Sequence, residues 1–122
     1  MNKYHTYHYY VSDRFSVGLV ISSQDSVRIQ VVSICIALTQ IFPAELKMSE
    51  VLPVVLAIAA DRSWRVRWSL AVKLFQVAQG MGSQAANNSL AECFEDMLRD
   101  QEAEVRRDTL DSSLRFILLC FR

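Results

Sequence analysis

The chain is poor in residues that break helices. Its 122 residues include only 3 glycines and 2 prolines, while 52% are hydrophobic and 21% are charged. This composition is too apolar for a disordered segment and too poor in turn residues for a many-stranded sandwich. Helices joined by short turns therefore fit the chain best, and its length suits a single domain.

An excess of charge and a long hydrophobic run are both missing. The 13 basic and 13 acidic residues give a formal net charge of zero, whereas non-specific binding to nucleic acid or to a membrane surface needs a basic excess. The longest apolar run, 51–60, contains Pro53 and has about half the length of a bilayer span. The first residues, MNKYHTYHYY, lack the apolar core of a secretory signal. We expect a soluble protein of the cytosol or nucleus, with no membrane or nucleic-acid partner.

The motifs of metal sites and of catalysis are also missing. The cysteines Cys35, Cys93 and Cys120 form no CxxC pair and lie in apolar stretches, which favours free thiols in a reducing compartment. His5 and His8 have the spacing of a metal pair, but no third ligand is nearby. The sequence contains no Gly-rich phosphate loop, no GxSxG elbow and no HExxH. We therefore predict no metal, no cofactor and no enzymatic activity.

What the chain does contain is an internal repeat. Val-Arg occurs at 27–28, 66–67 and 105–106, so that 39 residues separate each copy from the next. Asp61 and Asp100 are also 39 residues apart, each six residues before the arginine of its own unit. Apolar residues recur in further columns of the same alignment. A period of this length with a turn near its middle is typical of two-helix HEAT repeats.

Within each 39-residue unit the apolar residues have helical periodicity. For example, Val66, Leu70, Leu74 and Val77 follow one another at three- and four-residue steps. We predict helices over 26–42, 48–60, 64–79, 87–99 and 103–118, with Ser49 as an N-cap and with turns at 61–63 and 100–102. The expected fold is an all-α HEAT-repeat α-solenoid of antiparallel helix pairs, with about three repeats.

The repeats divide the chain unevenly. Residues 1–21 form an atypical N-terminal segment with a weak partial helix, and residues 22–122 carry the repeats. Residues 22–43 are the second half of a repeat, 48–82 are a full repeat, and 87–122 are a full repeat with a degraded C-terminal end. That end has polar residues in apolar columns, followed by an apolar tail: Thr109, Asp111, Ser112, Ser113, then Phe116, Leu118, Leu119 and Phe121. An uncapped apolar end predicts self-association.

Three consecutive segments resemble one protein family. They read QDSVRIQVVSICIALTQIFP (24–43), DRSWRVRWSLAVKLFQVAQGMG (61–82) and SLAECFEDMLRDQEAEVR (89–106). In this order they are similar to successive central repeats of the scaffolding (A) subunit of protein phosphatase 2A, and Ser-Trp-Arg-Val-Arg is their most distinctive string. The resemblance implies a non-catalytic scaffold or regulatory subunit. Its intra-repeat turns would bind phosphatase regulatory subunits, with the catalytic subunit toward the C-terminal repeats.

Two sets of residues are candidates for specific roles. The partner-binding set lies in and beside the turns within the units and comprises Asp61, Arg62, Ser63, Trp64, Arg65, Asp100, Gln101, Glu102 and Glu104. The structural ladder comprises Arg28, Asp61, Arg67, Asp100 and Arg106, and we expect Asp61 to pair with Arg67 and Asp100 with Arg106. Trp64 is either an exposed anchor for a partner or a side chain packed between repeats.

Two other functions stay open at this point. A HEAT adaptor of another class, such as a transport receptor or a chromosome-organising protein, would share the fold but not the Ser-Trp-Arg-Val-Arg string in this order. A non-functional fragment of a longer scaffold would account for the atypical ends.

Overall fold

The computed structural model describes residues 23–82 and 89–120, and within these two ranges the chain is all-α, with no strand. The elements are α3 (Asp25–Ile29), α4 (Val31–Thr39), α5 (Ala44–Leu46), the π-helical turn η1 (Lys47–Val51), α6 (Leu52–Ala59), α7 (Trp64–Met81), α9 (Ala91–Met97) and α10 (Ala103–Cys120). The prediction of an all-α fold is confirmed. The predicted segment 1–21, with His5 and His8, lies outside the described residues.

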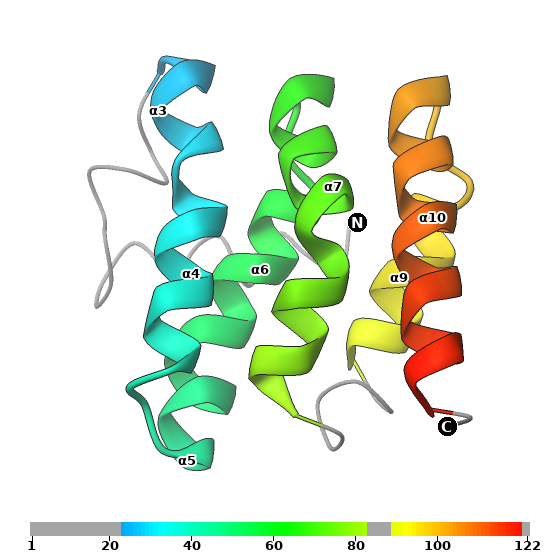
Figure 1. The fold of residues 1–122 in the computed structure, drawn as a ribbon. Coiled ribbons are helices and arrows are strands. Elements are labelled where there is room, and N and C mark those ends of the chain that lie inside the picture. Colours follow the sequence, from blue (N-terminus) through cyan, green and yellow to red (C-terminus); the bar gives the residue numbers. More distant parts are fainter. Residues whose placement is uncertain (1–22, 83–88, 121–122) are drawn as a thin grey trace.

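The helices form two layers. The second helices of the units, α4, α7 and α10, lie side by side in one layer, and α6 and α9 lie behind them (Figure 1). The central helix α7 packs against α4 on one side and α10 on the other, and α6 and α9 contact each other in the second layer. Helices α3, α7 and α10 all begin at the same end of the molecule, so the short turns before α7 and α10 share one edge (Figure 1).

The apolar faces predicted from the sequence form a continuous core between these layers. Val66, Leu70, Leu74 and Val77 of α7 are all fully buried in it. The thiols of Cys35 and Cys93 are free and buried there as well, while the side chain of Cys120 is outside the described set. Burial raises the pKa of Cys35 to about 12, so this thiol stays protonated at neutral pH.

Two predicted helices differ from the observed ones. The helix expected over 26–42 is interrupted at Gln30, between α3 and α4. The helix expected over 48–60 begins earlier, at Ala44, and Ser49 lies inside η1, so the predicted N-cap was wrong. Pro53 explains this π-helical turn, because its ring crowds the carbonyl four residues earlier and it has no N–H to donate. The wider turn directly before α6 accommodates both effects.

The polar residues of the last helix do not interrupt it. Thr109 and Ser112 are buried, and their hydroxyls donate to main-chain carbonyls, Thr109 Oγ1 to Val105 at 2.6 Å and Ser112 Oγ to Ala71 at 2.7 Å. The second of these bonds joins α10 to α7. A buried hydroxyl that is hydrogen-bonded costs little, so α10 packs against α7 despite these polar residues.

Helices α4 and α7 approach closely at their C-terminal ends. Gly80 faces Thr39 there, and a Cβ placed on Gly80 would overlap Thr39 Oγ1 and lie 2.8 Å from Thr39 Cβ. At the other end of this contact, Lys73 Nζ donates to Ser33 Oγ at 2.7 Å. The contact therefore combines a close approach at Gly80 with a side-chain hydrogen bond nearer the start of α4.

Candidate protein-binding edge

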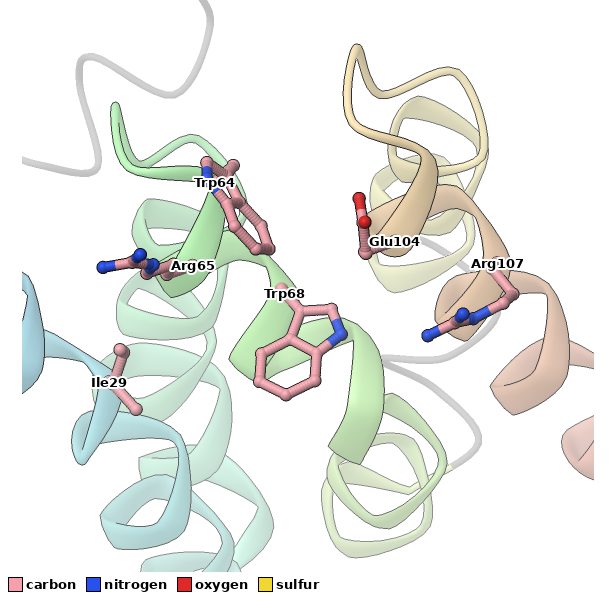
Figure 2. Close-up of a pocket in the computed structure, with 6 residues that line it drawn as sticks. All are labelled: Ile29, Trp64, Arg65, Trp68, Glu104 and Arg107. Carbon is pink, nitrogen blue, oxygen red and sulfur yellow. The ribbon is translucent and has the colours of Figure 1, made fainter.

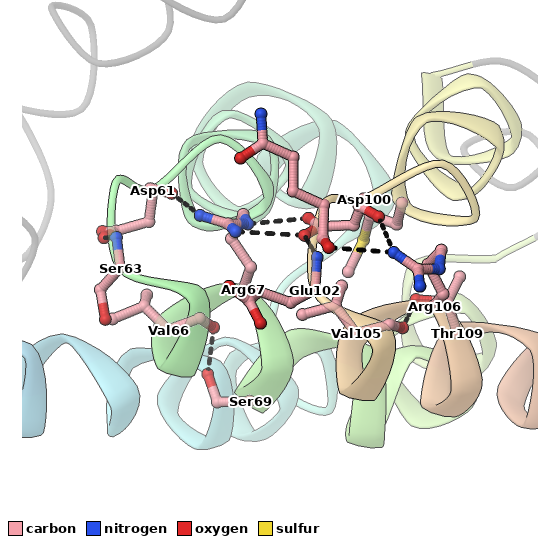
Figure 3. Close-up of polar contacts among 12 residues, drawn as sticks. Asp61, Ser63, Val66, Arg67, Ser69, Asp100, Glu102, Val105, Arg106 and Thr109 are labelled. Carbon is pink, nitrogen blue, oxygen red and sulfur yellow. Dashed lines mark hydrogen bonds and ion pairs between the residues drawn. The ribbon is translucent and has the colours of Figure 1, made fainter.

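Arginine side chains join the turns of successive units at this shared edge. Arg67 Nε donates to Asp100 Oδ2 at 2.7 Å, and Arg67 Nη2 donates to Asp100 Oδ1 at 3.1 Å (Figure 3). One unit earlier, Arg28 Nε and Nη2 donate to the two oxygens of Asp61 at 2.9 and 3.0 Å. Both pairs are bidentate, which fixes the direction of the guanidinium as well as its distance. The pairs repeat in the same register as the sequence.

The predicted partners within this ladder were wrong by one unit. We expected Asp61 to pair with Arg67 and Asp100 with Arg106, but each aspartate carboxylate receives the arginine of the preceding unit. Within its own unit the arginine binds main-chain oxygens instead. Arg67 Nη1 donates to Asp61 O at 2.8 Å, and Arg106 Nη1 donates to Asp100 O at 2.6 Å and to Gln101 O at 3.0 Å. The arginine thus holds its own turn with one nitrogen and the next carboxylate with two others.

Each aspartate also shapes its own turn. Asp61 Oδ1 accepts the main-chain N–H of Ser63 at 2.9 Å, and Asp100 Oδ1 accepts that of Glu102 at 3.0 Å. These i to i+2 bonds form Asx turns directly before the following helices. The two carboxylates are therefore occupied by their own turns and by the preceding arginines.

The electrostatics of the ladder favour the charged forms of Asp100 and Arg28. Burial opposes the negative charge of Asp100, but the hydrogen bonds from Arg67 and from the N–H of Glu102, with the charges of Arg67 and Arg106, hold its pKa below the ordinary 3.8. The hydrogen bond to Asp61 raises the pKa of Arg28, although burial acts in the opposite direction. Arg106 has no carboxylate partner among the described residues.

A pocket lies beside the edge, on the layer of second helices. Its volume is about 230 Å³, and it is lined by Ile29, Trp64, Arg65, Trp68, Glu104 and Arg107 (Figure 2). The guanidinium carbon of Arg65 lies 5.8 Å from the ring centroid of Trp64, within the range of a cation–π contact. The exposed Trp68 donates from Nε1 to Asp108 Oδ2 at 2.6 Å.

The pocket contains some of the predicted partner-binding residues but not all of them. Trp64, Arg65 and Glu104 line it. Trp64 is half-buried, so its exposure is intermediate between that of an exposed anchor and that of a side chain packed between repeats. Arg62 and Gln101 are exposed on the turns and do not line the pocket.

Sequence reasoning missed three of the lining residues, although the period contained the signal. Ile29, Trp68 and Arg107 are 39 residues apart and occupy one column of the repeat, whereas Arg65 and Glu104, both predicted, occupy another. The first column was missed because its three residues have no chemical type in common.

The arrangement is suited to binding a side chain of another protein. Two indole rings contribute to the lining, and Arg65 and Arg107 lie on opposite sides of Trp68 (Figure 2). Trp and Arg are the residue types that most often dominate the energetics of protein interfaces. Such a pocket fits an apolar or aromatic anchor residue, with Glu104 and two arginines beside it.

Within residues 23–82 and 89–120, no group of three His, Cys, Asp or Glu side chains could hold a metal ion. None of the helices in the described part of the chain has the length and apolar character needed to cross a membrane.

The chain matches no family model, and no curated protein is significantly similar to it.

Proposed function

We propose that this chain is a HEAT-repeat α-solenoid that acts as a non-catalytic scaffold and binds other proteins along the edge of its turns. The observation that carries the proposal is the ladder of bidentate pairs, Arg28 with Asp61 and Arg67 with Asp100, each spanning 33 residues. A ladder in register holds successive turns in fixed relative positions. Stacked helical repeats use such ordered surfaces to bind extended partners.

The proposed partners are the subunits of protein phosphatase 2A. The support is the resemblance of residues 24–106 to consecutive central repeats of its scaffolding subunit, which in that family lie near the regulatory subunit. In this proposal the regulatory subunit contacts the turns directly and the catalytic subunit is bound indirectly. Such a scaffold works in the cytosol or nucleus, where buried thiols such as Cys35 and Cys93 stay reduced.

Within this surface the pocket supplies the anchor point. Trp68 and Arg65 are exposed, and they come from the helix that begins directly after the turn at 61–63. Truncating an anchor of this kind typically costs 2 kcal/mol or more of binding free energy, which is roughly a thirtyfold loss of affinity.

The test is a binding measurement with purified regulatory and catalytic subunits and the immobilised full chain. We expect retention of a regulatory subunit, and affinity at least about tenfold lower for Trp68→Ala and for Arg65→Glu. The matched control is Glu45→Arg, which reverses an exposed charge on α5, outside the pocket, the turns and α10. Retention of neither subunit would refute the phosphatase assignment. Unchanged binding of both pocket variants would refute the role of the pocket.

A further inference from the structure

The last helix carries an apolar stripe on its outer face. Leu110, Leu114, Ile117 and Leu118 of α10 are all exposed. Their spacing of four, seven and eight residues from the first places them on one side of the helix. We call these four residues the α10 stripe.

The repeat register shows what such a stripe does elsewhere in the molecule. Leu110 corresponds to Ala71 of α7 and to Val32 of α4, each 39 residues from the next. Leu110 is 51% exposed, whereas Ala71 is 0% and Val32 is 2% exposed. Ile117, exposed at 49%, corresponds in the same way to Ala78, exposed at 1%. In the earlier units, the second helix of the following unit packs alongside: α7 packs against α4, and α10 packs against α7. On α10 the positions of Leu110 and Ile117 have no such cover among the described residues.

Charge favours a second copy of the chain as the occupant. The formal net charge is zero, so two copies approach without long-range repulsion. Asp111 and Arg115 border the stripe as an exposed i, i+4 ion pair with Arg115 Nε 3.3 Å from Asp111 Oδ2. In an antiparallel pair of α10 helices the order of these charges is reversed. The Asp111 of each copy then lies next to the Arg115 of the other copy, so opposite charges meet.

A head-to-tail stack is disfavoured by the ladder. To continue the ladder from one copy to the next, the N-terminal unit of the second copy would have to place a carboxylate next to Arg106. The residue 39 positions before Asp61 is Ser22, which has none. A contact between the α10 helices of two copies needs no such arginine–carboxylate pair. It is complete with two subunits and does not grow into a filament.

We infer that two copies of this chain form a reversible, antiparallel dimer through their α10 stripes. The contact is isologous, so each copy gives the same four apolar residues and the same bordering charges. None of the four stripe residues lines the pocket.

The oligomeric state of the full chain tests the inference. Sedimentation equilibrium over a range of concentrations should show a monomer–dimer equilibrium, and Leu114→Gln should weaken it at least about tenfold through lost apolar burial on both copies. Ile41→Gln is the matched control, because Ile41 is 75% exposed and follows α4 at the far side of the molecule. Far-UV circular dichroism checks that each variant is folded. A monomer at every concentration, or a dimer unaffected by Leu114→Gln, would overturn the inference.

Charge reversal tests the antiparallel arrangement. Asp111→Arg alone and Arg115→Asp alone should each weaken the dimer about two- to fivefold, because like charges then meet. An equimolar mixture of the two variants should associate as well as the original chain, since opposite charges meet again in the heterodimer. Arg106→Gln should have no effect. Failure of the mixture to recover, or loss of the dimer in Arg106→Gln, would overturn the antiparallel contact.

Discussion

Arg67 and Asp100 belong to different units of the chain, yet their side chains share two hydrogen bonds of 2.7 and 3.1 Å. The two side chains are 16% and 9% exposed, so the pair is largely shielded from water. In such surroundings a charged group that loses its partner is costly. The ladder therefore couples the stability of each unit to that of the next.

Removing a rung of the ladder should destabilise the fold. Asp100→Ala leaves Arg67 without its carboxylate and the N–H of Glu102 without its acceptor. We expect the free energy of unfolding to fall by about 2–4 kcal/mol, measured by urea denaturation. The control is Asp111→Ala, which breaks an exposed pair and should cost less than about 1 kcal/mol. Similar losses in both variants would contradict a structural role for the rung.

The same carboxylate predicts how stability depends on pH. The pKa of Asp100 is lower in the folded chain than its ordinary value of 3.8, so on acidification the unfolded state binds the proton first. The contribution of Asp100 is therefore complete above that ordinary value and is lost as the pH falls through the lower, folded-state pKa. Urea midpoints measured between about pH 2 and pH 6 should decline less steeply for Asp100→Asn. Parallel curves for the two proteins would argue against the shift.

The close approach of α4 and α7 predicts the effect of filling it. In Gly80→Ala the new methyl group would overlap the side chain of Thr39. Moving two packed helices apart should cost about 1–3 kcal/mol, although alanine favours the helix more than glycine does. Thermal unfolding measures this loss, and adding Thr39→Ala should recover part of it. A stabilised Gly80→Ala variant would show that the helices separate freely.

Thiol reactivity provides a test of the core. Burial holds the pKa of Cys35 at about 12, and the thiolate is the reactive form. Iodoacetamide at mildly alkaline pH should leave Cys35 unmodified in the native protein and modify it in urea. Peptide mass spectrometry distinguishes the two states. Rapid labelling without urea would mean that α4 separates readily from the core.

The sequence predicted the helices well because burial enforces periodicity. Val66, Leu70, Leu74 and Val77 all face the core, and each was identified from its spacing alone. The π-helical turn before Pro53 was missed, since the position of a proline shows that a helix must adapt but not how it adapts.

The candidate site was predicted less completely than the fold. Spacing identified Arg67 and Asp100 as ladder residues but did not show which carboxylate each arginine reaches. That choice depends on the direction of a long side chain, and Arg67 extends toward the following unit. Trp68 was overlooked because the residue type at its position changes from unit to unit. The same column contains Ile29, Trp68 and Arg107, and all three line the pocket.

Helix α7 is bound on both sides by its neighbours. Lys73 reaches Ser33 of α4, and Ser112 of α10 reaches the carbonyl of Ala71. Packing on both sides opposes the local opening of α7 that amide exchange requires. The amide hydrogens of α7 should therefore be the last in the chain to exchange with deuterium, and exchange should advance inward from α3 and α10.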